Sequence, residues 1–279
     1  MKEAKDSEII IEANGPSPSF SWRELRLYRD LLRSLVLRDW KVRYGQTRLG
    51  LLWMVIQPAI AAIVLAFIFG FIVQRDSEAI SFPLFVLSGW MCWSYFSSSA
   101  LQSTQLMPQY LTVMKKVYFP RAILPMSKLL SLFPEFLTGL GLTLIYAGIE
   151  GVLSWRALLI PLALPLVALV SYPVSLLFAA LGGSYRDIQQ LTPYFFQLLF
   201  FLSPVVYPSG LLGAYLPDWA QMLLYLNPVT GLMDLFRFIL FEDWQMQPQI
   251  WWSAVSTTVL TLIGVGVFSR EERQWSAEL

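Results

Sequence analysis

Six long apolar segments, separated by shorter polar stretches, dominate the pattern of hydrophobic and polar positions along the chain. Each has close to the roughly 20 residues that a helix needs to cross the hydrocarbon core of a bilayer. The segments cover residues 51–73, 82–104, 121–148, 157–181, 191–212 and 249–269. The pattern therefore predicts an all-α polytopic membrane protein with six transmembrane helices in a domain of residues 45–279.

The polar region before these segments divides into a tail and a helix. Residues 1–20 are rich in charge, glycine and proline, which indicates a mobile N-terminal tail. Residues 21–44 open with a capping pattern, because Ser21 can cap the helix and Glu24 can reach back to it. Apolar residues then recur at helical spacing, at Leu25, Tyr28, Leu32, Leu35 and Val36. Arginines surround this stripe, so we expect an amphipathic helix that lies along the membrane surface.

Two further apolar segments precede the last span, and both are too short to cross a bilayer. They cover residues 217–226 and 228–241, and each opens with residues typical of a helix start. Asn227 is positioned to cap the second segment just before Pro228. The pattern allows two arrangements: a re-entrant pair of helices that dips into the bilayer, or two helices lying flat on the outer surface.

The basic residues are distributed asymmetrically between the two sides that six spans define. Of the 20 lysines and arginines, 17 fall on the side that carries both termini. Only Arg75, Arg156 and Arg237 fall on the other side. Because lysine and arginine accumulate in cytoplasmic loops, both termini are predicted to be cytoplasmic. The basic stretch of residues 38–48, directly before the first span, marks the same membrane surface.

Composition argues against a catalytic subunit. The chain of 279 residues is 56% hydrophobic and 14% charged, has one cysteine, Cys92, and lacks histidine. Without histidine it lacks the usual proton shuttle at neutral pH and the commonest metal ligand. The glycine-containing stretches GQTRLG and GGSYRD both lack the Gly-Lys-Ser/Thr ending of a phosphate-binding loop. We therefore expect no catalytic site, cofactor or metal in this chain, and energy supplied by another chain.

Four patches, spread in order along the chain, resemble the membrane subunit of type-2 ABC exporters for polysaccharides, the family of O-antigen, capsule and teichoic acid permeases. The patches read RDWKVRYGQTRLGLLWMVIQP at 38–58, KKVYFPRAILP at 115–125, YRDIQQLTPYFFQLLFFLSPVVYP at 185–208 and NPVTGLMDLFRFIL at 227–240. The resemblance implies a permease of the bacterial inner membrane that exports a lipid-linked, O-antigen-like polysaccharide.

The resemblance also implies partners and working parts. It implies a second copy of this chain and two ATP-binding subunits, which would hold ATP and Mg²⁺, with membrane lipids around the complex and no role for nucleic acid. The amphipathic helix would be a cytoplasmic interface helix. Residues of about 105–120 would form a coupling loop between spans two and three, and residues of about 217–241 would form outer gate helices.

Four residues of the loop between spans two and three are candidates for docking to the ATPase. They are Met114, Lys115, Lys116 and Tyr118. The resemblance supports a docking role, whereas the alternative is ordinary loop charge on the cytoplasmic side.

Three arginines near the predicted cytoplasmic mouth are candidates for binding a lipid pyrophosphate as it enters: Arg43, Arg48 and Arg121. A guanidinium binds phosphate oxygens in a bidentate way that an ammonium group cannot. The alternative is contact with bulk anionic phospholipid.

Aromatic residues are dense in spans two and five, and several lie away from the span ends. The candidates for lining a channel are Trp90, Trp93, Tyr95, Phe96, Tyr194, Phe200, Phe201 and Tyr207. Rings that stack on sugar faces with few fixed hydrogen bonds would let a polymer slide. The alternative is that they pack against lipid or form interfacial belts, as most membrane aromatics do.

Glu135 in the third segment is the clearest carboxylate within the predicted bilayer. A charge there is costly, so we expect it to face protein or water, with a structural partner or protonation favoured over a transport role. Lys128 lies two helical turns earlier on the same face, which is too far for a direct bridge.

Three other functions are weighed against polysaccharide export. An exporter of a smaller amphiphile, a lipid or a drug, fits the same pattern. A membrane transferase that modifies glycans would need an acid–base cluster, which the lack of histidine and the few membrane carboxylates disfavour. A passive channel would need rings of charge within its spans.

Overall fold

The computed structural model describes residues 26–45, 47–70, 80–114, 116, 119–209 and 218–278. These residues form helices and their connections, and the only β pairing among them is an isolated antiparallel bridge between Leu153 and Phe241. The expected all-α class is confirmed for this part of the chain. The predicted tail and the capping pattern at Ser21 lie outside the described residues.

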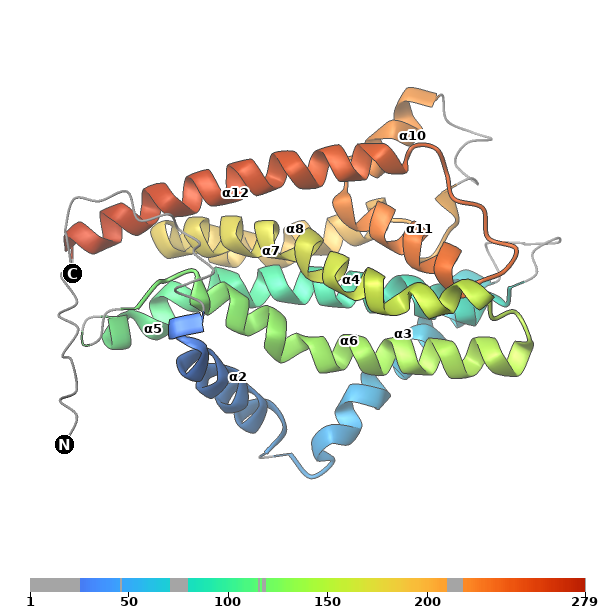
Figure 1. Ribbon diagram of the computed structural model, residues 1–279, viewed down its shortest axis with the longest axis horizontal. Coiled ribbons are helices and arrows are strands. Elements are labelled where there is room, and N and C mark those ends of the chain that lie inside the picture. Colours follow the sequence, from blue (N-terminus) through green and yellow to red (C-terminus); the bar gives the residue numbers. More distant parts are fainter. Residues whose placement is uncertain are drawn as a thin grey trace, which may run out of the picture.

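Long helices run side by side and make up the body of the molecule (Figure 1). The α-helices are α2 (Arg29–Tyr44), α3 (Trp53–Gly70), α4 (Phe82–Thr104), α5 (Leu106–Met114), α6 (Ile123–Glu150), α7 (Ile160–Ser184), α8 (Arg186–Leu202), α10 (Asp218–Tyr225), α11 (Pro228–Leu240) and α12 (Ile250–Glu278). Two 3-10 turns, η1 (Gly50–Leu52) and η2 (Trp155–Leu159), precede α3 and α7. The short helix α5 lies at one end of the bundle with the C-terminal end of α12, and α10 and α11 lie at the other (Figure 1).

Among the residues that the structure describes, four helical segments are long and apolar enough to cross a membrane: Gly50–Gly70, Ile123–Glu150, Trp155–Ser184 and Ile250–Trp275. They coincide with predicted segments one, three, four and six. The helices at predicted segments two and five differ from these four. α4 has 23 residues, but six of them are serines, and α8 has only 17 residues. The chain is thus a multi-pass membrane protein.

α4 is the central helix of the bundle, with 16 of its 23 residues buried. It packs between α6 and α7 and also contacts α3 and α11. Three of its serine hydroxyls, those of Ser88, Ser97 and Ser99, donate to carbonyls of the preceding turn, for example Ser88 Oγ to Phe85 O at 2.7 Å and Ser99 Oγ to Phe96 O at 2.8 Å. Small side chains with internally satisfied hydroxyls let neighbouring helices approach closely, which suits the core position of α4.

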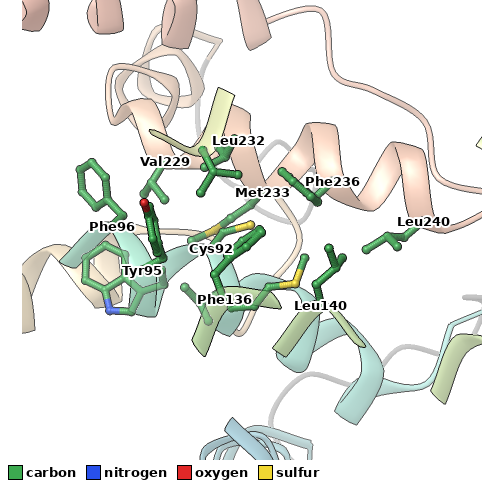
Figure 2. Close-up of a cluster of buried hydrophobic side chains, with 14 of the residues drawn as sticks. Cys92, Tyr95, Phe96, Phe136, Leu140, Val229, Leu232, Met233, Phe236 and Leu240 are labelled. Carbon is green, nitrogen blue, oxygen red and sulfur yellow. The ribbon is translucent and has the colours of Figure 1, made fainter. Parts of the chain in front are cut away.

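α11 inserts its side chains into the bundle, and 11 of its 13 residues are buried. Figure 2 shows Val229, Leu232, Met233 and Phe236 of α11 among side chains of α4 and α6. The predicted cap is confirmed, since Asn227 Oδ1 accepts from Val229 N at 3.3 Å. α10 differs, because its apolar residues Trp219 and Leu223 are exposed.

The helix at the fifth apolar segment is shifted relative to its prediction. The apolar pattern predicts residues 191–212, whereas α8 begins at Arg186 and ends at Leu202. Ser203 after it is extended, with φ −99° and ψ 140°. A residue before proline is pushed out of the helical region by the proline ring, and Pro204 follows directly. Apolar character continues past this point, whereas residues 203–208 are not helical.

Candidate functional site

Two adjoining cavities lie beside α4, and three residues line both of them. One cavity has a volume of about 850 Å³ and the other about 490 Å³. Trp53 and Gln57 of α3 and Glu135 of α6 belong to both walls. We call the larger one the aromatic cavity and the smaller one the polar cavity.

The aromatic cavity is walled by α3, α4, α6 and α8. Five of the eight aromatics predicted to line a channel border it: Trp90, Trp93, Tyr95, Phe200 and Phe201. The Trp93 ring is centred 5.6 Å from that of Phe200, and the Trp90 ring 6.0 Å from it. Edge-to-face contacts of this kind hold the rings in fixed orientations.

The other three predicted aromatics lie elsewhere. Phe96 is 2% exposed and packs behind the cavity against Trp93 and Phe196. Tyr194 is exposed on the outside of α8. The hydroxyl of Tyr207 donates to the Phe201 carbonyl at 3.1 Å. The structure therefore brings five of the eight predicted aromatics to one cavity and leaves the other three outside it.

The polar cavity is built around Glu135. Arg43 and Tyr44, at the end of α2, both donate to Glu135 Oε1, and the second nitrogen of Arg43 donates to Gln102 Oε1 at 2.8 Å. Burial and the neighbouring carboxylate raise the pKa of Tyr44, so its phenol stays protonated and acts as a donor. The carboxylate predicted to need a partner has two.

The three candidate arginines occupy different settings. Arg43 pairs with Glu135, as described. Arg48 is exposed in the turn before η1, just ahead of Gly50, whose positive φ of 50° suits a glycine. Arg121 is 8% exposed, and its Nη1 donates to the Glu272 carbonyl on α12 at 2.9 Å. The structure does not bring them into one phosphate-binding cluster.

Two of the four coupling candidates lie among the described residues. Met114 ends α5 and packs against the apolar cluster of α5, α6 and α7, while Lys116 is exposed. Lys115 and Tyr118 lie outside the described residues. The α5 end of the bundle therefore presents at least one solvent-exposed lysine shortly after a helix that buries one face.

Several cavity residues escaped the sequence-based prediction. Trp53, Gln57 and Phe196 all border the aromatic cavity. Gln57 could have been predicted from the sequence. Apart from Trp53, it is the only residue with a side-chain hydrogen-bonding group in the apolar stretch 51–73, and it precedes Pro58. Phe196 could not have been predicted to border the cavity, since the sequence pattern alone does not distinguish it from its exposed apolar neighbours on α8.

Arg237 of α11 also escaped prediction, although it is 1% exposed. Its guanidinium donates to the carbonyls of Pro204 at 2.9 Å and of Val205 and Phe85 at 3.3 Å. The same group lies 3.6 Å from the centre of the Phe85 ring. Arg237 thus joins α11 to α4 and to the segment that follows α8.

The sequence of this helical bundle matches a known protein family along most of its length. The sequence profile of the ABC-2 type transporter family matches residues 30–241. The chain belongs to the ABC-2 type transporter family. This match confirms the resemblance to the membrane subunit of type-2 ABC exporters. As an ABC-2 protein it is the membrane component of a transporter, and the matched region contains both cavities and α11.

Curated ABC-2 relatives match this chain over nearly their whole length. It is 29% identical over 241 residues to the O-antigen export system permease protein RfbA of Myxococcus xanthus, covering 85% of this chain and 91% of that protein. It is 25% identical over 248 residues to RfbA of Klebsiella pneumoniae, covering 86% and 92%. The polysialic acid transport protein KpsM of Escherichia coli is 26% identical over 255 residues, covering 86% and 93%.

Proposed function

We propose that this chain is the permease subunit of an ATP-driven exporter that moves a lipid-linked polysaccharide across the bacterial inner membrane. The observation that carries the proposal is the aromatic cavity, which adjoins a polar cavity holding Arg43 and Glu135. The relatives named for O-antigen export and polysialic acid transport support polysaccharide as the substrate class.

The chemistry of the aromatic cavity suits a sugar polymer. Trp90, Trp93, Phe200 and Phe201 present ring faces and edges, which can pack on the apolar faces of sugar rings. Gln57 and Ser94 add polar groups to the same wall. Many weak contacts and few strong ones favour passage over retention, because a deep binding site would slow release.

The polar cavity suits the charged end of the substrate. Arg43 can present two nitrogens to phosphate oxygens, and a lipid pyrophosphate would compete with Glu135 for it. Exposed Arg48 and the partnered Arg121 would stand near the cytoplasmic mouth, where the substrate enters. The alternative for each arginine is contact with bulk phospholipid, and the experiment below tests the substrate role of Arg43.

Membrane placement follows from the same proposal. α3, α4, α6, α7, α8 and α12 would be the six spans, with α10 and α11 as re-entrant gate helices at the outer side. The burial of α11 supports this arrangement over a helix lying flat on the surface. The α5 end and both termini would then be cytoplasmic, and α2 would be the interface helix.

The exporter would contain two copies of this chain and two ATP-binding subunits that hold ATP and Mg²⁺. One copy offers a cavity of about 850 Å³, the size of a site for a small ligand rather than a passage for a polymer. A second copy would supply the remaining wall, and the α5 region would receive the ATPase.

Deletion of the gene tests the proposed function directly. We expect lipid-linked polysaccharide to accumulate inside the cell, and export to return with the unmodified chain. An Arg43→Lys variant keeps a positive charge beside Glu135 but loses the two-nitrogen contact with phosphate, so normal insertion with impaired export would assign Arg43 to substrate handling. Normal polysaccharide export in the deletion strain, with a lipid or drug retained instead, would favour the smaller amphiphile and overturn the proposal.

A further inference from the structure

Three polar contacts join α2 to α6 in matching order. Lys128 Nζ lies 2.6 Å from Asp39 Oδ2, and Trp40 Nε1 donates to the Ser131 carbonyl at 2.8 Å. The third contact is the pair of Arg43 and Glu135. We call these three contacts the α2–α6 ladder.

The order of the ladder fixes how the two helices sit along each other. Its α6 members, residues 128, 131 and 135, share one helix face because they are spaced by three and four residues. The partners on α2 run in the same direction, from Asp39 to Arg43. Sliding one helix past the other by a single turn, about 5.4 Å, would break all three contacts together. The ladder therefore resists sliding as well as separation.

The first contact is the most strongly desolvated of the ion pairs described for this chain. The side chains of Asp39 and Lys128 are each 9% exposed, compared with 80% and 89% for Arg29 and Asp30 on the same helix. Separating a buried pair leaves uncompensated charge in a medium of low polarity, whereas separating an exposed pair exchanges one partner for water. Separating Asp39 from Lys128 is therefore more costly than separating the exposed pair of Arg29 and Asp30.

Arg38 extends the ladder to α5. Its guanidinium donates to the hydroxyl of Tyr110 and lies 4.7 Å from the centre of that ring. The same group lies 3.1 Å from the carboxylate of Asp39. Tyr110 of α5 is 2% exposed and packs within the apolar cluster of α5, α6 and α7. A continuous path of polar contacts therefore runs from Tyr110 through Arg38 and Asp39 to Lys128.

We propose that Asp39 and Lys128 are positioning residues for transport, which make α2 and α6 move as one body when α5 is displaced. A displacement of α5 then moves Glu135, on the shared wall of the two cavities, because α2 and α6 do not shift relative to each other. The inference rests on the proposed function, because it takes the α5 region as the place where the ATPase acts.

A charge exchange separates this role from simple stabilisation of the fold. In the complex reconstituted with its ATPase, Asp39→Lys or Lys128→Asp alone should lower polysaccharide exported per ATP hydrolysed about tenfold. The double exchange restores the pair and should recover export to within about threefold of the unmodified complex. Asp30→Lys changes an exposed acid on the same helix and serves as the matched control, with no change expected. An unaltered ratio of export to hydrolysis in both single variants would overturn the inference.

A distance measurement covers the case in which a single variant fails to fold. Spin labels at Val42→Cys on α2 and Leu130→Cys on α6 occupy exposed sites, and Cys92 is fully buried. In complexes with one labelled copy, the distance between labels should be the same before and after trapping the ATPase with vanadate. With Lys128→Arg, which keeps the pair, it should also stay constant.

The outcomes separate the two proposals. A complex that hydrolyses ATP and exports polysaccharide while the α2–α6 distance changes overturns only the ladder. A chain that recruits no ATPase overturns the proposed function and the ladder with it. A constant distance together with recovery in the double exchange supports both.

Discussion

Arg43 and Glu135 form an ion pair although 92 residues separate them in the chain. Arg43 belongs to the amphipathic helix α2, and Glu135 belongs to α6, a helix long and apolar enough to span a membrane. The pair lies where the aromatic and polar cavities meet. A carboxylate that would be costly within a bilayer is thereby neutralised by a helix whose sequence pattern predicts a place at the surface.

Replacing Glu135 with glutamine should destabilise the protein and alter transport together. The change removes the carboxylate that accepts from Arg43 and Tyr44, and we expect a loss of about 1–3 kcal/mol in stability. Thermal unfolding of the purified protein in detergent measures this loss. An exposed acid provides the control, and Asp30→Asn should leave unfolding unchanged. Equal unfolding temperatures for both variants would contradict a structural role for the pair.

Truncation of cavity aromatics should separate packing from transport. Trp93 is 5% exposed and contacts three other rings, so Trp93→Ala should cost about 3–5 kcal/mol. Phe201 is 54% exposed, so Phe201→Ala should retain most of the stability and change the export rate. Unfolding curves and export assays on the same preparations test both. Export by Phe201→Ala at the unmodified rate would argue that this ring faces lipid.

Gly89 on α4 should not tolerate a side chain. A methyl group there would lie 2.6 Å from Arg237 Nη2 and 3.1 Å from the Val205 carbonyl oxygen. Gly89→Ala should therefore displace Arg237 and cost about 1–3 kcal/mol. Gly141 on α6 has no such neighbour within 4 Å, and Gly141→Ala is the matched control. Since alanine favours helix more than glycine does, the control should be neutral or slightly stabilising by up to about 1 kcal/mol.

The end of α5 should be required for coupling to the ATPase. Met114 packs against the cluster of α5, α6 and α7, and a cationic residue, Lys115, follows it in the sequence. Replacing both with aspartate introduces negative charge at the proposed docking region. Export by the reconstituted complex should fall while ATP hydrolysis continues. Unchanged export would show that the ATPase docks elsewhere.

Local pattern predicted the elements that depend on local chemistry. Predicted segments 82–104 and 121–148 coincide with α4 and α6 to within two residues, and the cap at Asn227 is present. The predicted end of the fifth helical segment, residue 212, was wrong, because α8 ends at Leu202. The apolar pattern continues beyond Pro204, but the residue before a proline is pushed out of the helical region. Hydrophobicity reports where a segment can be buried, and it does not report where backbone geometry changes.

The sequence alone determined that the chain is helical and polytopic and that it resembles ABC exporter permeases. Long apolar runs, the uneven distribution of basic residues between the two sides and short motifs can all be found without knowledge of the tertiary structure. Only the tertiary structure decided that Phe196 borders the cavity while Tyr194 is exposed, and that Arg43 reaches Glu135. In a membrane protein the residues facing lipid and those facing the interior are both apolar, so periodicity carries little information about which face is which. The packing of α2, α4, α6 and α8 supplied that information.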